Sequence, residues 1–186
     1  MQNRSKVMNN TEIERKYLLS NNLWRDYIIE SHAISQAYLS LSDGNTIRIR
    51  RYDNQAFITI KSHPKKGSIA RFEWEKEISL DDYKSLLPHA VSNVIEKTRH
   101  IVPLQMSIPL KIEIDEFHGV HEGLVLAEIE LPSEDFPLTL PAFIGEEVTG
   151  DPRYHNSHLS RNNGQYTAAV PSENFQNNLT SNNEAV

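Results

Sequence analysis

The chain has 186 residues, a formal net charge of −6, no cysteine and a mean hydropathy of −0.53. This length suits one domain with a proper core rather than two. The acidic balance argues against a general nucleic-acid binder, and the lack of cysteine excludes disulfides and thiolate metal sites. The sequence contains no apolar run long enough for a membrane span or a signal peptide. We therefore expect a cytoplasmic protein that binds neither nucleic acid nor a membrane.

Composition divides the chain into three parts. Residues 1–10 are polar and show no pattern, and residues 161–186 are rich in Asn, Ser, Thr and Gln with few large apolar groups. Such segments bury too little apolar surface to offset the entropy lost on ordering. We expect both ends to be disordered and residues 11–160 to form a single folded domain.

Alternating apolar and polar residues, the period of a β-strand, dominate this domain. They predict eight strands, over residues 12–18, 36–41, 46–52, 56–62, 70–78, 95–101, 110–117 and 125–131. Residues 42–45 and 52–55 have the composition of hairpin turns, and residues 64–67 predict a longer loop.

Helical signals are fewer. A first helix is expected from residue 20, where apolar residues at positions 23, 24, 27 and 28 follow helical spacing. Ser79 opens a capping-box pattern that predicts a second helix ending before Pro88. A third, short helix is expected after Pro152. These elements predict a mainly β fold of the α+β class, an eight-stranded antiparallel sheet closed into a barrel with a few helices packed outside.

Seven of the eight predicted strands carry charged residues on one face and apolar residues on the other. The charges are segregated by sign along the strands. The basic set is Lys16, Arg48, Arg50, Lys61, Arg71, Lys97 and Arg99, and the acidic set is Glu12, Glu14, Glu73, Glu75, Glu113, Asp115, Glu128 and Glu130. A half-exposed sheet with its polar face in solvent is one interpretation. The segregation by sign, together with amphipathic helices that could cover an apolar outer face, favours a barrel with a charged interior.

The charge balance of such an interior predicts a metal requirement. Eight acidic and seven basic residues give a net charge of about −1, which would not attract a polyphosphate of about −4 to −5. Two divalent ions would bring the interior to about +3. Hard carboxylate ligands without thiols indicate Mg²⁺ or Mn²⁺. Arginine pairs suit bidentate contacts with phosphate oxygens.

The same residues carry a resemblance to a known family. The Glu12-Ile13-Glu14-Arg15-Lys16 segment resembles the ExExK hallmark of the triphosphate tunnel metalloenzymes, also called the CYTH group. The later charged pairs follow in the order typical of that family. Residues 145–151, with Arg153 and Tyr154, resemble a stretch of its small bacterial members. The resemblance spans residues 11–160.

The resemblance implies an eight-stranded tunnel that binds a triphosphate with one or two Mg²⁺ or Mn²⁺ ions. It is closest to the bacterial tripolyphosphatases, and it implies metal-dependent hydrolysis of a phosphoanhydride bond. The substrate-binding residues would be Lys16, Arg48, Arg50, Lys61, Arg71, Lys97 and Arg99, and the metal ligands would come from Glu12, Glu14, Glu73, Glu75, Asp115, Glu128 and Glu130. Lys16 would also position or deprotonate the attacking water, if burial among cations lowers its pKa.

Several alternatives stay open on sequence alone. A class IV-type adenylyl cyclase, a thiamine- or nucleoside-triphosphatase, and a non-catalytic polyphosphate-binding module share these charged strands. The cyclase is less favoured because Asn9, Asn10 and Thr11 replace the His-Phe pair that often precedes ExExK there. Any single charged residue could instead form a simple inter-strand ion pair, Glu75 and Glu113 most readily. Whether a homodimer forms is also open.

The histidines offer no paired spacing within the charged stripes. His63, His89, His100, His118, His121, His155 and His158 lie mostly at turns or at the ends of elements. We expect them on the surface. Arg153 and Tyr154 either cap one end of the tunnel or pack without a further role.

Overall fold

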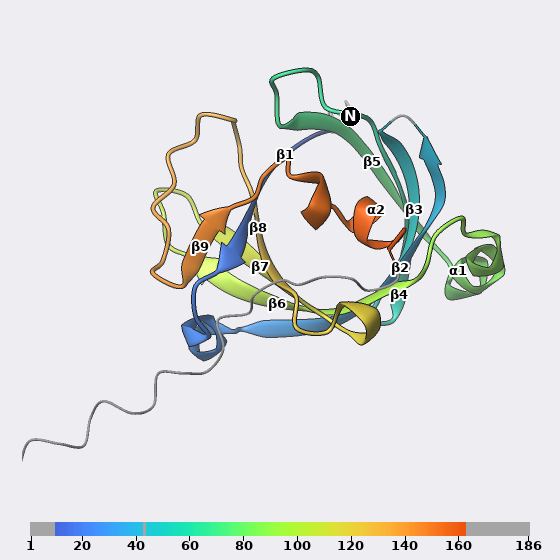
Figure 1. Cartoon of the computed structure of the whole chain (residues 1–186), viewed down its shortest axis with the longest axis horizontal. Helices are drawn as coiled ribbons and strands as arrows, with labels where there is room; N and C mark the ends of the chain where they lie inside the picture. The colour runs from blue at the N-terminus through green and yellow to red at the C-terminus, as the bar shows by residue number, and fades with distance from the viewer. Residues whose placement is uncertain (1–9, 43, 163–186) are drawn as a thin grey trace, which may run out of the picture.

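A computed structural model describes residues 10–42 and 44–162, and within them the chain forms a closed antiparallel β-barrel (Figure 1). Its eight strands are β1 (Thr11–Leu19), β2 (Glu30–Ser42), β3 (Asn45–Tyr52), β4 (Gln55–Lys61), β5 (Ala70–Ile78), β6 (Ile95–Leu104), β7 (Leu110–Phe117) and β8 (Val125–Glu130). All eight predicted strands are present, and the predicted fold class is confirmed. The terminal segments expected to be disordered lie outside the described residues, apart from residues 10, 161 and 162.

Strand β1 closes the barrel by pairing on both of its edges. On one edge it runs antiparallel to β8, from Glu14 opposite Glu130 to Leu18 opposite Leu126. On the other edge it pairs with β5 through only three residues, Thr11 to Ile13. A ninth short strand, β9 (Ile144–Glu147), takes up the remainder of that edge. Strand β9 was not predicted from the sequence, because four residues are too few to display a period.

The outer, apolar face of β2–β4 is covered by helix α1 (Leu80–Leu86). The predicted capping box is present, with Ser79 and Asp82 bonded to each other's backbone amides. Tyr83 of α1 packs against Ala37 and Ile49 in a buried cluster. As predicted, α1 ends before Pro88, at Leu86. A separate 3₁₀ turn, η2 (Leu87–His89), follows it and includes Pro88, which is tolerated in a first helical turn.

A second cluster lies outside β6, β7 and β8, around the buried Trp24. Trp24 belongs to the 3₁₀ helix η1 (Leu23–Tyr27), which replaces the α-helix expected from residue 20. Leu23 and Tyr27 are each 58% exposed. The apolar residues of this segment therefore do not form a continuous buried stripe, and only one turn of helix is stabilised by packing.

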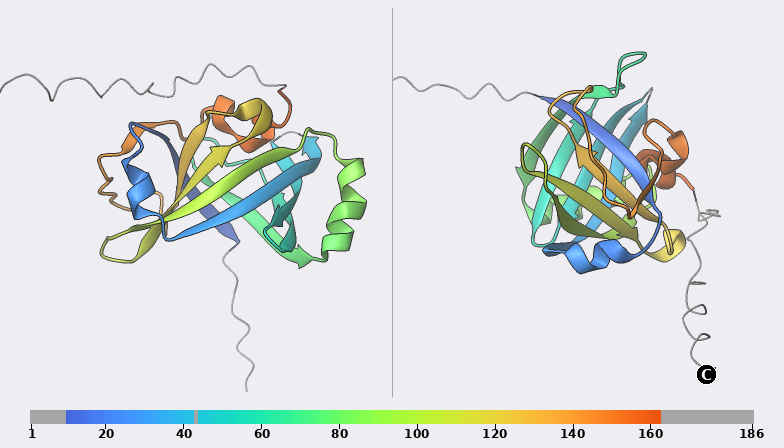
Figure 2. Two further views of the ribbon diagram at one scale, coloured as in Figure 1. Left: turned by 90° about the horizontal axis from the view of Figure 1, so that it is seen from below. Right: turned by 90° about the vertical axis from the view of Figure 1, so that its left-hand side faces the viewer.

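One end of the barrel is filled by the segment that follows β9. The expected third helix is split into η4 (Pro152–Tyr154) and α2 (Asn156–Leu159), and Figure 1 shows α2 within the ring of strands. Figure 2 shows the same segment lying across that end of the barrel. Leu159 is fully buried there against a cluster of apolar side chains. This inner cluster consists of Ile95, Phe117, Leu124, Leu126 and Leu159, with Leu18 and Tyr154 packed on it.

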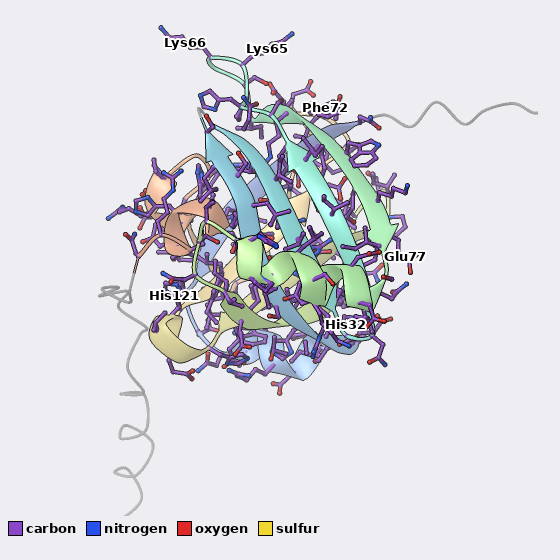
Figure 3. All side chains as sticks on the ribbon, turned by 90° about the vertical axis from the view of Figure 1, so that its right-hand side faces the viewer. His32, Lys65, Lys66, Phe72, Glu77 and His121 are labelled. Atoms are coloured by element: carbon purple, nitrogen blue, oxygen red, sulfur yellow. The ribbon has the colours of Figure 1, made fainter. Side chains whose placement is uncertain are left out.

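The connections agree with the turns expected from composition. Residues 52–55 form the β3–β4 hairpin, with Asp53 in the left-handed region at φ 50°. Lys65 and Lys66 stand at the tip of the loop between β4 and β5, away from the barrel (Figure 3). The η3 turn (Gly119–His121) joins β7 to β8. Among the described residues, no helix is long and apolar enough to cross a membrane.

The inner apolar cluster should contribute strongly to stability. Leu126 is fully buried in it, so Leu126→Ala should lower the free energy of unfolding by about 2–5 kcal/mol through lost burial and a residual cavity. Leu23→Ala, at a largely exposed leucine, is the matched control and should change it by less than about 0.5 kcal/mol. Denaturant unfolding measures both. Equal losses in the two variants would contradict this account of the packing.

Candidate active site

The interior of the barrel is lined by the charged faces of its strands. Residues directly opposite one another on neighbouring strands share a face, so Arg48, Thr59 and Glu75 form one row and Lys16 and Glu128 belong to another. Each of the predicted basic site residues forms an ion pair with a carboxylate on the same inner face. These residues are Lys16, Arg48, Arg50, Lys61, Arg71, Lys97 and Arg99.

Glu12 lies between two cations where β1 meets β5. Its Oε1 accepts a hydrogen bond from Lys61 Nζ at 2.6 Å, and its Oε2 accepts one from Arg71 Nε at 2.7 Å. Burial opposes ionisation, but the two cations outweigh it and lower the pKa of Glu12 to about 2. Lys61 Nζ is also 3.4 Å from Glu73. Glu12 is therefore an anion throughout the physiological pH range.

The β1–β8 pair concentrates negative charge. Glu14 lies directly opposite Glu130, and on the next pair of strands Glu128 lies opposite Glu113. Like charges directly opposite one another destabilise a sheet. Burial and the neighbouring Glu128 carboxylate raise the pKa of Glu14. Lys16 is the nearest counter-charge, with Nζ 2.6 Å from Glu128 and 3.7 Å from Glu14.

Asp115 is the most deeply buried charge, with no exposed surface. It accepts hydrogen bonds from Lys97 and from two nitrogens of Arg99, the latter both at 2.7 Å. Arg99 also donates to Glu113, and to Glu128 at 2.7 Å. Burial lowers the pKa of Lys97 to about 8 in spite of its pairing with Asp115. Bidentate pairing of this kind fixes the guanidinium plane.

Arg48 and Arg50 line the wall formed by β3, β4 and β5. Arg50 donates to Glu75 at 2.9 Å, and Arg48 donates to Thr59 at 3.1 Å. The Arg50 guanidinium lies 5.8 Å from the ring of Tyr52 and 5.7 Å from that of Phe57. Burial and repulsion from Arg48 lower the pKa of Arg50 to about 10. Two arginines side by side in this setting form a site suited to an anion.

The segment from β9 to α2 meets the site at Lys16. The backbone amide of Lys16 donates to Thr149 Oγ1 at 2.9 Å, and its carbonyl accepts from Val148 N at 2.8 Å. Lys16 Nζ lies 3.4 Å from the carbonyl oxygen of Tyr154. Tyr154 also packs on the inner apolar cluster, whereas the Arg153 side chain is 70% exposed and pairs with Asp151. Tyr154 therefore helps to close the barrel.

His155 is a site residue that the sequence analysis placed on the surface. It is half-buried, and burial together with the charges of Lys16 and Arg71 lowers its pKa to about 4. His100 and His121 are buried as well, so the expectation of surface histidines was wrong for these three. No periodic pattern marks His155, because it reaches the site through the fold of the C-terminal segment rather than from a strand.

The hypothesis that Lys16 acts as a base does not fit its surroundings. Burial disfavours its charge as expected, but its close neighbours are the carboxylates of Glu128 and Glu14 rather than cations. They outweigh the burial and raise the pKa of Lys16 above its ordinary value. Lys16 is therefore a stable cation that can orient an anion or a water molecule.

The predicted metal ligands face the interior but do not form a closed cage. In residues 10–42 and 44–162, no three acidic or histidine side chains converge as a ready-made metal cluster. Glu12, Glu73, Glu75 and Asp115 are each held by lysine or arginine. Glu130, which is exposed, has no ion pair among the interactions of the described residues and faces Glu14.

Fold and site together define a β-barrel protein with an ionic interior of paired anionic and cationic strands. Residues 10–154 match the model of the CYTH domain. An inorganic triphosphatase from Acetivibrio thermocellus is 36% identical over 81% of this chain and 94% of its own. One from Nitrosomonas europaea is 34% identical over 81% of this chain and 97% of its own. The chain therefore belongs to the CYTH domain family.

Solved structures agree with this assignment. A crystal structure of an inorganic triphosphatase matches with a TM-score of 0.57 and 31% identity, over 81% of this chain and 95% of that one. A protein from Pyrococcus horikoshii OT3 matches with a TM-score of 0.51 over 67% of this chain and 80% of that one. At 17% identity, the second match concerns the fold alone.

The position of His155 predicts a specific pH dependence of stability. The unfolded chain takes up this proton near pH 6.5, and the folded protein only near pH 4. Between these values the unfolded state binds more protons, so the free energy of unfolding falls as the pH is lowered. His155→Asn removes this contribution and should lose less stability than the parent protein between pH 7.5 and pH 5.

Denaturant unfolding at the two pH values measures the effect, and His89→Asn, at an exposed histidine, is the control. The control should follow the parent protein. A pH dependence that is the same in all three proteins would show that His155 is not held beside Lys16 and Arg71.

Proposed function

We propose that the protein is a metal-dependent triphosphatase that cleaves a phosphoanhydride bond of inorganic tripolyphosphate. The observation that carries this proposal is the interior in which seven lysine and arginine side chains line one barrel and each is paired with a carboxylate. Two relatives at 34–36% identity over most of the chain bear the name inorganic triphosphatase, which favours hydrolysis over cyclisation.

The ion pairs explain how a triphosphate would be held. Phosphate oxygens can replace carboxylate oxygens as hydrogen-bond acceptors for Arg48, Arg50, Lys61, Arg71 and Arg99, because both are anionic and suit the same donor geometry. The carboxylates displaced in this exchange need new positive partners, since an unpaired buried charge is costly. Substrate and divalent cations are therefore expected to bind together.

The donor set fits a divalent metal. Glu14 and Glu130 lie directly opposite each other and Glu128 is adjacent, and burial together with the Glu128 carboxylate raises the pKa of Glu14. We propose these three carboxylates as metal ligands, with Glu12, Glu73, Glu75 and Asp115 as nearby oxygen donors. Mg²⁺ is commonly held by one or two carboxylates plus substrate phosphates, so a preformed cage is not required. Mn²⁺ suits the same ligands.

The chain's own residues would supply positioning and charge. Arg48 and Arg50 on one wall and Lys97 and Arg99 on another would stabilise charge on the transferring phosphoryl group. Lys16, held as a cation beside Glu128, would orient the attacking water or a phosphate oxygen. The bound metal would offset phosphate charge and lower the pKa of a coordinated water.

The decisive experiment is phosphate release from tripolyphosphate, thiamine triphosphate and ATP, each with Mg²⁺, with Mn²⁺ and with a chelator. We expect turnover of tripolyphosphate that requires metal, and lower activity on the two substrates with an organic group. Cyclic AMP formation from ATP without phosphate release would show a cyclase instead. Tight triphosphate binding without turnover under either metal would show a binding module.

The metal assignment leads to a test by substitution. Glu14→Ala and Glu130→Ala should each reduce metal-dependent turnover by more than about 100-fold, since even the outer-shell partners of metal ligands typically cost 10–100-fold. Glu14→Ala should not lower the melting temperature, because it removes a buried charge that faces another carboxylate. Glu122→Ala, at an exposed glutamate, is the control. Full activity in either site variant would refute the assignment.

A further inference from the structure

A glutamine in the wall of the barrel has no role in the charge pattern. Gln36 lies on β2, opposite Arg50 of β3 and Ile95 of β6. Its neighbours Ser35 and Ala37 contact Tyr83 of α1 on the outer side. Because successive side chains of a strand point to opposite faces, Gln36 points into the barrel.

The carboxamide of Gln36 is buried without hydrogen bonds. The residue has no exposed surface, and neither Nε2 nor Oε1 has a partner among the described residues. Leaving even one buried polar atom unpaired is unfavourable, and here both a donor and an acceptor are unpaired. A glutamine at this position therefore costs the folded protein stability that an apolar side chain of similar size would not cost.

The unpaired groups around Gln36 are not isolated. Arg50, directly opposite on β3, also has a buried Nε without a partner, and so does Arg48, two residues along the same strand. All three side chains belong to the inner face of β2 and β3. Three unused donors on one patch of wall match the acceptor oxygens of a phosphoryl group, which offers several lone pairs at once.

We propose that Gln36 is a substrate-binding residue that contacts a phosphoryl oxygen together with Arg48 and Arg50. Its Nε2 donates to the phosphoryl oxygen, and its Oε1 accepts from water that hydrates the same group. This inference rests on the proposed triphosphatase function and adds a neutral residue to an otherwise charged site. The free protein keeps an unsatisfied carboxamide, and the bound substrate satisfies it.

The proposal predicts opposite effects of one substitution on stability and on binding. Gln36→Met is close in volume and removes the unpaired atoms, so it should raise the melting temperature of the free protein by about 2–8 °C. It should also raise KM for tripolyphosphate by about 10- to 100-fold, the value of a hydrogen bond to a charged group, with a smaller change in kcat. Gln36→Glu should raise KM further, because its carboxylate repels the substrate and pairs with Arg48 or Arg50.

The measurements are thermal unfolding of the free protein, steady-state kinetics with Mg²⁺ and tripolyphosphate, and the stabilisation produced by Mg²⁺ with imidotriphosphate, whose bridging nitrogens resist hydrolysis. Gln105→Met, at an exposed glutamine in the β6–β7 loop, is the matched control and should change none of them. The expected result is a more stable Gln36→Met protein that imidotriphosphate stabilises less than it stabilises the parent.

An unchanged KM in the Gln36→Met protein would overturn the inference, because it would exclude contact with substrate. A lower melting temperature beside the unchanged KM would show that a structural water, and not substrate, satisfies the carboxamide. If the parent protein neither hydrolyses tripolyphosphate nor is stabilised by imidotriphosphate, the proposed function itself fails, which the parent measurement alone reveals.

Discussion

The neutralisation of charge inside a closed barrel is the constraint on which the rest of this structure depends. Desolvating a charge is costly unless an opposite charge and hydrogen bonds compensate. The interior meets this requirement by placing cationic and anionic strands around one lumen, so that Asp115 is held by Lys97 and Arg99 and Glu12 by Lys61 and Arg71. Removing one member of this network would leave its partners with fewer counter-charges, so these interactions are coupled to one another.

Stability must then come mainly from elsewhere, because buried ion pairs return little net free energy. The apolar clusters lie outside the barrel wall, beneath α1 and around Trp24, and at one end of the lumen around Leu126 and Leu159. The core is thus distributed around the site instead of occupying the centre. The segment after β9 has a double role, since it completes the inner apolar cluster and also contacts Lys16.

Sequence alone predicted the part of this arrangement that is periodic. The alternation of charged and apolar residues assigns one face of each strand to the interior and the other to the outside. The interior position of Arg48, Arg50 and Glu14 therefore follows from a local pattern. The closed barrel with a charged interior was favoured over a half-exposed sheet, because the charges are segregated by sign and amphipathic helices could cover an apolar outer face. The four-residue β9 and the division of the last helix carry no period, and neither was predicted.

The sequence also could not show which charged residues pair with each other inside the barrel, since pairing depends on the register between strands that are distant in the chain. Lys16 could act as a base only if burial among cations lowered its pKa, yet β8 brings Glu128 against it and the pKa is raised instead. His155 enters the site from a segment more than 130 residues after Lys16 in the chain, and no sequence pattern marks it. Gln36 could be placed on an inner face by its period, but only the three-dimensional packing shows that its carboxamide is unpaired.

These features indicate a site whose free form is incomplete. Glu14, opposite Glu130, shares its nearest counter-charge, Lys16, with Glu128, and Gln36, Arg48 and Arg50 hold unused hydrogen-bonding groups. A metal–triphosphate complex would supply both missing partners. Its cation would pair with the carboxylates, and its phosphoryl oxygens would accept hydrogen bonds from the donors. The carboxylates and the hydrogen-bond donors line the same lumen. A cation bound without the triphosphate, or a triphosphate bound without a cation, would therefore add an uncompensated charge there. If the proposed function holds, binding of anion and cation would be coupled by the electrostatics of the barrel itself.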